Sequence, residues 1–178
     1  MGKIVFITGG CRSGKSAYAL KIAEEISKTR IYLATCPSGV DDEMDSRIEK
    51  HINERDEGWK TVDEPVDIAG VILEQGSKDV ILVDCLTLWV SNLMQRAFNN
   101  KIGITEEEVS DYCMDIIKAC QSVSASVIFV TNETGMGIVP DNKASRDFRD
   151  LLGRCNQVMA SRADSAYLMV SGIPLKLK

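Results

Sequence analysis

Histidine is nearly absent from this chain, because His51 is the single histidine in 178 residues. The six cysteines form no C-x-x-C pair and lack partnering histidines, so we expect reduced thiols and no zinc site. No apolar run approaches the ~20 residues of a membrane-spanning helix. The short apolar start MGKIVFIT leads into glycines and not into a signal cleavage site. These absences predict a cytoplasmic protein without a membrane span.

Positive charge is also in deficit, with a formal net charge of −5. Such a chain has no overall basic field to attract nucleic acid or an anionic membrane, so we expect no nucleic-acid partner. Any anionic ligand has to be held by local groups. The length and the 44% hydrophobic content suit one domain, residues 1–178, with its own core.

Strand-like and helix-like patterns alternate along the chain. Thr105 and Glu108 form a capping-box pattern at the start of one of the helices. The alternation predicts parallel β-α-β units, and hence an α/β fold of three layers with a mostly parallel sheet flanked by helices. The expected strands are 3–8, 30–35, 79–84, 126–131 and 166–172, and the expected helices are 16–27, 41–55, 65–75, 85–98, 106–121 and 143–162.

The stretch GGCRSGKS, residues 9–16, fits the phosphate-loop pattern G-x-x-x-x-G-K-[ST] and lies between a predicted strand and a predicted helix. Glycines let successive backbone N–H groups turn toward phosphate oxygens, and the following helix adds its positive N-terminus. Lys15 reaches the β and γ phosphates, and the Ser16 hydroxyl can bind Mg²⁺. The fold is therefore predicted to be P-loop NTPase-like, with nucleotide bound by Gly9, Gly10, Cys11, Arg12, Ser13, Gly14, Lys15 and Ser16.

Asp84 ends the predicted strand 79–84, which is the third along the chain. Phosphate-loop enzymes place a carboxylate at such a position near the magnesium ion, so we predict Asp84 as the second metal ligand beside Ser16. The alternative is that Asp84 caps the helix that starts near Cys85.

His51 lies in the stretch RIEKHINERDEGW. If residues 41–55 are helical, Arg47, His51 and Arg55 share one stripe. Two neighbouring cations disfavour the imidazolium, so we expect a largely neutral imidazole, which is a nucleophile. The arginines could neutralise a phosphate that it attacks. Spacing alone does not distinguish this role from that of a solvated surface histidine.

Seven stretches together resemble the bifunctional adenosylcobinamide kinase/adenosylcobinamide-phosphate guanylyltransferase family of cobalamin biosynthesis. The most restricted patterns are R-I-x-x-H-x-x-x-R-x-x-x-W and T-N-E-x-G-M-G-I-V-P. The stretches cover nearly the whole chain in order: ITGGCRSGKS, YLAT, DDEMDSRIEKHINERDEGWKTVDEP, VILVDCLTLWVSNL, VTNETGMGIVPDN, RDFRDLLGRCNQ and VSGIPLKLK.

The resemblance implies an enzyme that first phosphorylates the aminopropanol hydroxyl of adenosylcobinamide with ATP or GTP. It then transfers GMP from GTP to that phosphate through a GMP–histidine, which aligns with His51, and forms adenosylcobinamide-GDP. His51 and Lys15 are the implied catalytic residues. Adenosylcobinamide and its phosphate are the implied partners, GTP, ATP and Mg²⁺ the cofactors, and a homotrimer the implied assembly.

The resemblance also assigns residues outside the phosphate loop. Ala34, Thr35 and Cys36 match a stretch near the nucleotide, and Arg55 and Asp63 match positions near the guanylylated histidine. The segment Asn132–Pro140, with Arg146, Arg149 and Asp150, matches a family signature without individual roles. Two departures stand out: Asp56 follows Arg55 where the family usually has proline, so we expect a looser turn, and Asp63 replaces a glutamate. Both bear on affinity more than on reaction type.

Two other functions stay open from the residues alone. One is a divergent small-molecule kinase of the phosphate-loop class, in which His51 carries no GMP. The other is a non-metabolic GTP-binding module. The N-K-x-D motif of switch GTPases is missing, and Thr131-Asn132-Glu133 has the wrong spacing for it.

Overall fold

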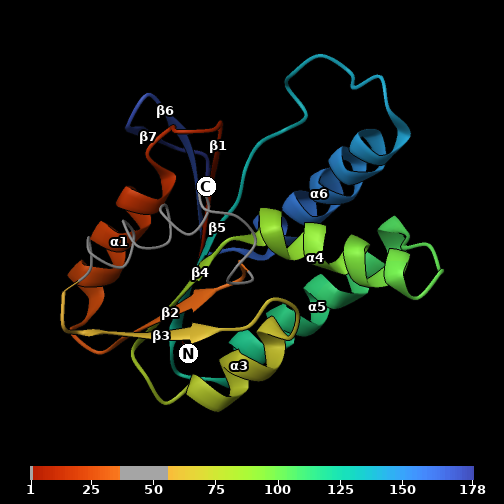
Figure 1. Cartoon of the computed structure of the whole chain (residues 1–178). Coiled ribbons are helices and arrows are strands. Elements are labelled where there is room, and N and C mark those ends of the chain that lie inside the picture. The colour runs from red at the N-terminus through yellow and green to blue at the C-terminus, as the bar shows by residue number, and fades with distance from the viewer. Residues whose placement is uncertain (1, 37–55) are drawn as a thin grey trace.

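The structure is a computed structural model that describes residues 2–36 and 56–178. The helix predicted over 41–55 lies outside the described residues. The remaining chain builds one sheet of seven strands in the order β3-β2-β4-β5-β1-β6-β7 (Figure 1). The strands are β1 Ile4–Gly9, β2 Arg30–Ala34, β3 Trp59–Asp63, β4 Val80–Asp84, β5 Ser126–Val130, β6 Ser165–Val170 and β7 Ile173–Lys176.

Strand pairing is parallel throughout this sheet except between β6 and β7, which are antiparallel. The mostly parallel sheet predicted from the sequence is therefore confirmed. Helices supply the crossovers between parallel strands. They are α1 Lys15–Ile26, α3 Ile68–Gln75, α4 Leu86–Asn99, α5 Glu106–Ser122 and α6 Lys143–Arg162.

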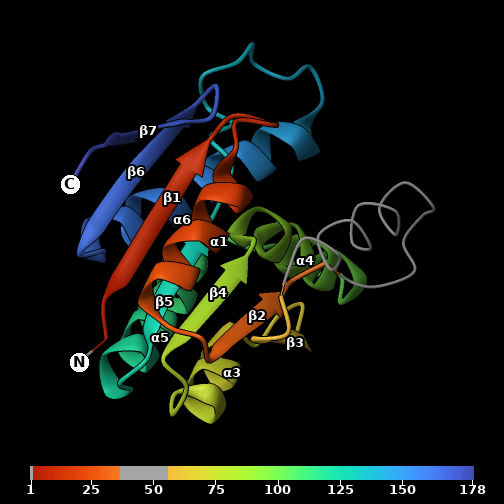
Figure 2. The ribbon, with the colours of Figure 1, turned by 90° about the vertical axis from the view of Figure 1, so that its left-hand side faces the viewer.

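The helices cover the two faces of the sheet unequally. Among the described helices, α1 lies alone on one face, while α3, α4, α5 and α6 cover the other (Figure 2). Side chains of β1 alternate between the two resulting cores: Val5 and Ile7 pack with α1, whereas Phe6 packs in the core of the four helices. This arrangement confirms three layers. Within the described residues, no helix combines the length and apolarity needed to cross a membrane.

Two strands were missed by sequence reasoning. The β3 sequence WKTVD has no apolar run, since β3 is an edge strand with exposed Lys60 and Thr61. The β7 sequence IPLK is exposed along its length and contains Pro174, which is tolerated at a sheet edge. Because β3 precedes it, Asp84 ends the fourth strand and not the third.

Capping side chains and positive φ angles explain where two helices begin and where β6 ends. The predicted helix 65–75 begins later, at Ile68, because the Asp67 side chain accepts a hydrogen bond from Gly70 N and caps it. The capping box of Thr105 and Glu108 is confirmed at the start of α5. The predicted strand 166–172 ends earlier, at Val170, because Ser171 and Gly172 adopt φ of 51° and 84° in the turn to β7.

Candidate active site

The carboxyl ends of five strands meet at one edge of the sheet. Ala34 of β2 lies in register with Asp63 of β3 and with Asp84 of β4, and Asp84 lies in register with Val130 of β5. Val130 pairs in turn with Ile7 of β1, just before the phosphate loop. In open α/β sheets, ligands bind outside this edge. Sheet register thus brings the phosphate loop and both aspartates to one side of the molecule.

The phosphate loop needs glycine at both of its motif positions. A Cβ on Gly9 would stand 2.5 Å from the Met169 carbonyl oxygen and 2.8 Å from Ser13 Oγ. Gly14 has φ of +92°, and a Cβ there would lie 3.1 Å from Gly172 Cα. The turn between β6 and β7 therefore packs against the loop, and Gly172 N donates to the Ser13 carbonyl over 2.9 Å. This contact fixes the loop from a segment far away in sequence.

Several polar groups of the loop have no partner within residues 2–36 and 56–178. The backbone N–H groups of Cys11, Arg12 and Gly14 make no hydrogen bond to another described residue. Ser13 Oγ is buried and has no hydrogen-bond partner within the described chain. A loop with free N–H donors at the start of a twelve-residue helix suits an anion. The loop therefore fits the phosphates of a nucleotide.

Lys15 is buried at the first position of α1, with 8% of its surface exposed. Its Nζ donates to the Gly10 carbonyl over 2.7 Å, across the loop. Burial lowers the pKa of Lys15 below its ordinary 10.5, and the negative charge of Asp84 opposes that shift. The loop lysine and Asp84 are thus close enough to interact electrostatically.

The Asp84 carboxylate is not a helix cap. Cys85 occupies the N-cap of α4 without a side-chain hydrogen bond, so the alternative interpretation of Asp84 is wrong. Asp84 Oδ2 instead accepts from the Tyr32 hydroxyl over 3.0 Å. Together with the Ser16 hydroxyl at the start of α1, the carboxylate supplies oxygen donors of the kind that Mg²⁺ prefers. Each side chain therefore offers the kind of donor atom that this ion requires.

The segment 34–36 is tied to the chain that follows Asp84. The Thr35 hydroxyl accepts from Cys85 N and donates to the Cys85 carbonyl, both over 2.8 Å. Asn92 Nδ2 donates to the Thr35 carbonyl over 2.7 Å and to the Pro65 carbonyl over 2.9 Å. Burial raises the pKa of Cys85 to about 12, which makes it a neutral thiol and excludes it as a nucleophile near neutral pH. Sequence reasoning missed Asn92, which looked like any polar residue of a helix.

The turn at Asp56 is not loose on its described side. The Asp56 carboxylate pairs with the buried Arg30 guanidinium and accepts from Gly58 N over 2.8 Å. The hydrogen bond from Arg30 keeps the pKa of Asp56 below its usual range. The Asp56 side chain is therefore held in place by Arg30 and by the backbone of Gly58.

The structure brings most of the predicted residues together. The phosphate loop, residues 34–36 and Asp84 share the carboxyl edge of the central strands. Asp63 lies at the same edge but is exposed and separated from β4 by β2. His51 and Arg55 lie outside the described residues.

The signature loop after β5 leaves the same edge of the sheet (Figure 1). Arg146 Nη1 donates to the carbonyls of Pro140 and Asp141 over 2.9 and 2.6 Å, so it holds the end of the loop. Arg149 forms a long ion pair with its neighbour, with 4.0 Å between Arg149 Nε and Asp150 Oδ1.

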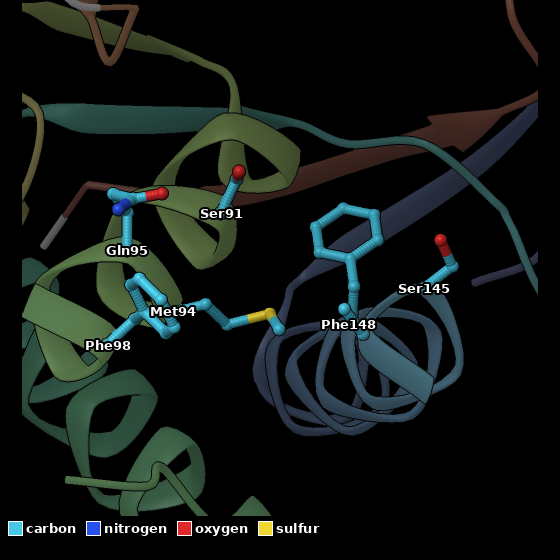
Figure 3. A pocket seen from close by; sticks show the side chains of 7 residues that line it. Ser91, Met94, Gln95, Phe98, Ser145 and Phe148 are labelled. Atoms are coloured by element: carbon cyan, nitrogen blue, oxygen red, sulfur yellow. The ribbon is translucent and has the colours of Figure 1, made fainter. Parts of the chain in front are cut away.

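A separate groove of about 430 Å³ lies between α4 and α6. Figure 3 shows Met94 extending from α4 toward α6, where Phe148 stands. None of the predicted nucleotide residues lines the groove, so it is not the phosphate site. Its lining consists of Ser91, Met94, Gln95, Phe98, Ala144, Ser145 and Phe148.

Comparison with known proteins gives a family match over nearly the whole chain. The model of the family described as "Cobinamide kinase / cobinamide phosphate guanyltransferase" matches residues 5–177. The chain is 38% identical to the bifunctional adenosylcobalamin biosynthesis protein CobU of Escherichia coli (strain K12), covering 98% of this chain and 99% of that protein. It is 34% identical to the bifunctional adenosylcobalamin biosynthesis protein CobP of Pseudomonas aeruginosa, covering 97% of this chain and 95% of that protein. The resemblance inferred from the sequence is confirmed.

Solved structures of more distant proteins share the fold. The flagellar accessory protein FlaH from Methanocaldococcus jannaschii superimposes with a TM-score of 0.55 at 15% identity, covering 99% of this chain and 78% of that one. An ATPase from a bacterial type III secretion system superimposes with a TM-score of 0.60 at 11% identity, covering 94% of this chain and 51% of that one. These likenesses concern architecture alone and agree with the predicted P-loop NTPase-like fold.

Proposed function

Because the chain belongs to the cobinamide kinase / cobinamide phosphate guanyltransferase family, we propose that it catalyses both reactions of that name. It phosphorylates adenosylcobinamide and then transfers GMP to the phosphate, giving adenosylcobinamide-GDP. The observation that carries the proposal is that the phosphate loop and Asp84 lie at the same edge of the sheet, with only β5 between their strands, in a chain that matches the family over residues 5–177. GTP serves the second step, and ATP or GTP serves the first.

In the first step, the aminopropanol hydroxyl oxygen of adenosylcobinamide attacks the γ phosphorus of the nucleotide. The bond from that phosphorus to the β–γ bridging oxygen breaks, the nucleoside diphosphate leaves, and the hydroxyl proton passes to solvent. Lys15 and the free N–H groups of the loop stabilise the charge that develops on the phosphate oxygens. Ser16 and Asp84 would hold Mg²⁺, which supplies further charge neutralisation when bound.

In the second step, an imidazole nitrogen of His51 attacks the α phosphorus of GTP, and the bond to the α–β bridging oxygen breaks as pyrophosphate leaves. A phosphate oxygen of adenosylcobinamide phosphate then attacks the same phosphorus. The P–N bond breaks, and His51 is regenerated. Dividing the transfer into two displacements is covalent catalysis. Arg55 and Asp63 are proposed to assist near this histidine, as the family likeness implies.

Replacing Asp84 by asparagine tests the metal role. We expect the kcat of phosphoryl transfer to fall by about 10²-fold, because a charged ligand is lost where phosphate charge has to be neutralised. The half-saturating Mg²⁺ concentration should rise, which a magnesium titration of the activity measures. Asp79→Asn is the matched control, since Asp79 is exposed and lies just before the opposite end of β4. An equal half-saturating Mg²⁺ concentration in the two variants would show that Asp84 does not bind the metal.

The function is tested by following the corrinoid product by mass spectrometry. With ATP and Mg²⁺ we expect adenosylcobinamide phosphate, and after GTP is added we expect adenosylcobinamide-GDP. A product that stops at the phosphate would indicate the divergent kinase. Nucleotide binding without any corrinoid product would indicate a GTP-binding module.

We also propose that the enzyme works as a homotrimer in the cytoplasm, as the family likeness implies. Met136 and Ile138 in the loop after β5 are 84% and 97% exposed. Apolar side chains this exposed are what an interface between copies would cover. A molar mass by light scattering of about one chain, 19.6 kDa, would contradict the trimer.

A further inference from the structure

A buried ring of hydrogen bonds surrounds the point where the chain leaves β5. Asn132 N donates to Thr87 Oγ1 over 2.7 Å, and Asn156 Nδ2 donates to the Asn132 carbonyl over 3.0 Å. Thr131 Oγ1 donates to Asn156 Oδ1 over 2.9 Å. The Thr87 and Thr131 hydroxyl oxygens are 3.4 Å apart. Four residues from α4, α6 and the end of β5 thus close a ring.

The direction of each bond follows from the donor count. Thr131 has one hydroxyl proton, and Asn156 Oδ1 accepts it. The Thr87 hydroxyl therefore donates to Thr131 Oγ1 while it accepts from Asn132 N. Each of the four contacts thus joins one donor to one acceptor, and such closed networks fix a single geometry. Thr87, Thr131 and Asn156 are at most 9% exposed, in an otherwise apolar core.

The ring holds a segment that lies between the two halves of the phosphate site. Strand β5 is flanked by β1, which leads into the phosphate loop, and by β4, which ends at Asp84. Beyond β5 the chain still pairs with β1: Thr131 N donates to the Ile7 carbonyl and Glu133 N to the Gly9 carbonyl, both over 3.0 Å. Asn132 is therefore placed beside Gly9, the first residue of the loop.

Asn132 is held by its backbone alone. Its N–H and carbonyl are both part of the ring, whereas its side-chain carboxamide makes no hydrogen bond to another described residue. Asn132 is also only partly buried. Two buried side chains thus fix the backbone of a residue whose own amide is left for a ligand.

We propose that Thr87 and Asn156 are positioning residues for phosphoryl transfer. By fixing the Asn132 backbone, they set its carboxamide between the phosphate loop and Asp84, where its N–H groups donate to the phosphoryl group in transfer. The inference rests on the proposed kinase function. It assigns to the signature loop after β5 a role that its sequence alone did not reveal.

The test is a double-mutant cycle on the kcat of adenosylcobinamide phosphorylation. Thr87→Val keeps the shape of the side chain and removes the hydroxyl, and Asn132→Ala removes the carboxamide. Each is expected to lower kcat about tenfold or more with the nucleotide KM within about threefold, because the lost contact forms mainly in the transition state. If Thr87 acts through Asn132, the kcat of the double variant equals the kcat of the slower single variant. Thr87→Ser restores the hydroxyl and is expected to recover most of the kcat.

The inference is overturned if the two kcat effects multiply, or if Thr87→Val lowers only the melting temperature and leaves the kcat of the folded protein unchanged. Gln157→Ala, at an exposed position next to Asn156 on α6, controls for changes in the helix surface. A wild-type protein that forms no adenosylcobinamide phosphate would overturn the proposed function, and this inference with it. An active wild type matched by Thr87→Val would overturn the inference alone.

Discussion

His51→Ala is expected to abolish the covalent GMP adduct and to lower guanylyl transfer by about 10⁴-fold or more, since the nucleophile of the reaction is removed. Phosphorylation of adenosylcobinamide should continue, because its chemistry requires the phosphate loop and no histidine. The two activities of one chain are thereby separated by one substitution.

The measurement is the intact mass of the protein after incubation with GTP and Mg²⁺. Wild type should gain one GMP, and the modification should be acid-labile and base-stable, as a phosphoramidate is. Because the chain has no other histidine, a histidine adduct can form at one position only. His51→Gln keeps a polar side chain without a nucleophilic nitrogen and is expected to behave like His51→Ala.

A wild-type protein that binds GTP but gains no mass would contradict the covalent mechanism. His51 would then be a surface residue, and the divergent kinase would become the better description. An adduct that survives in His51→Ala would place the nucleophile elsewhere in the chain.

Lys15→Met is expected to lower the kcat/KM of both reactions by about 10³-fold or more, because one charge serves the phosphates in each. Lys15 is buried and already bonded to the Gly10 carbonyl, so the loss is both electrostatic and structural within the loop. Lys15→Arg should not restore the activity, since the planar guanidinium does not fit a site built for an ammonium. This pattern differs from that of His51→Ala, which spares the kinase.

The control for Lys15→Met is Lys21→Met on the same helix. The Lys21 side chain is 71% exposed and forms one i,i+4 pair with Glu25, so its removal should leave both reactions unchanged. Steady-state kinetics of the two half-reactions, with thermal melting of each variant, provide the measurement. A Lys15→Met enzyme that keeps either activity would show that this reaction does not use the phosphate loop.

Most strands and helices could be predicted from the local sequence. Strands such as 79–84 are continuous apolar runs because the helices cover both faces of the sheet, and this pattern is readable in one dimension. The phosphate loop was equally readable, because all of its motif residues lie within eight consecutive positions. Edge strands β3 and β7 escaped detection because half-exposed strands need no apolar run.

Local patterns in the sequence by themselves determined the α/β class and the phosphate loop, and the resemblance of seven stretches along the chain indicated the family. Those features depend on residues close in sequence or on patterns that repeat along it. The tertiary structure alone decided that Asp84 is no helix cap, that the turn after β6 supports Ser13, and that Thr87, Thr131 and Asn156 enclose Asn132. Thr87 and Asn132 are 45 positions apart, and no local spacing rule links them. Only the order of strands in the sheet brings such residues into contact, because hydrogen bonds depend on distance in space and not on distance along the chain.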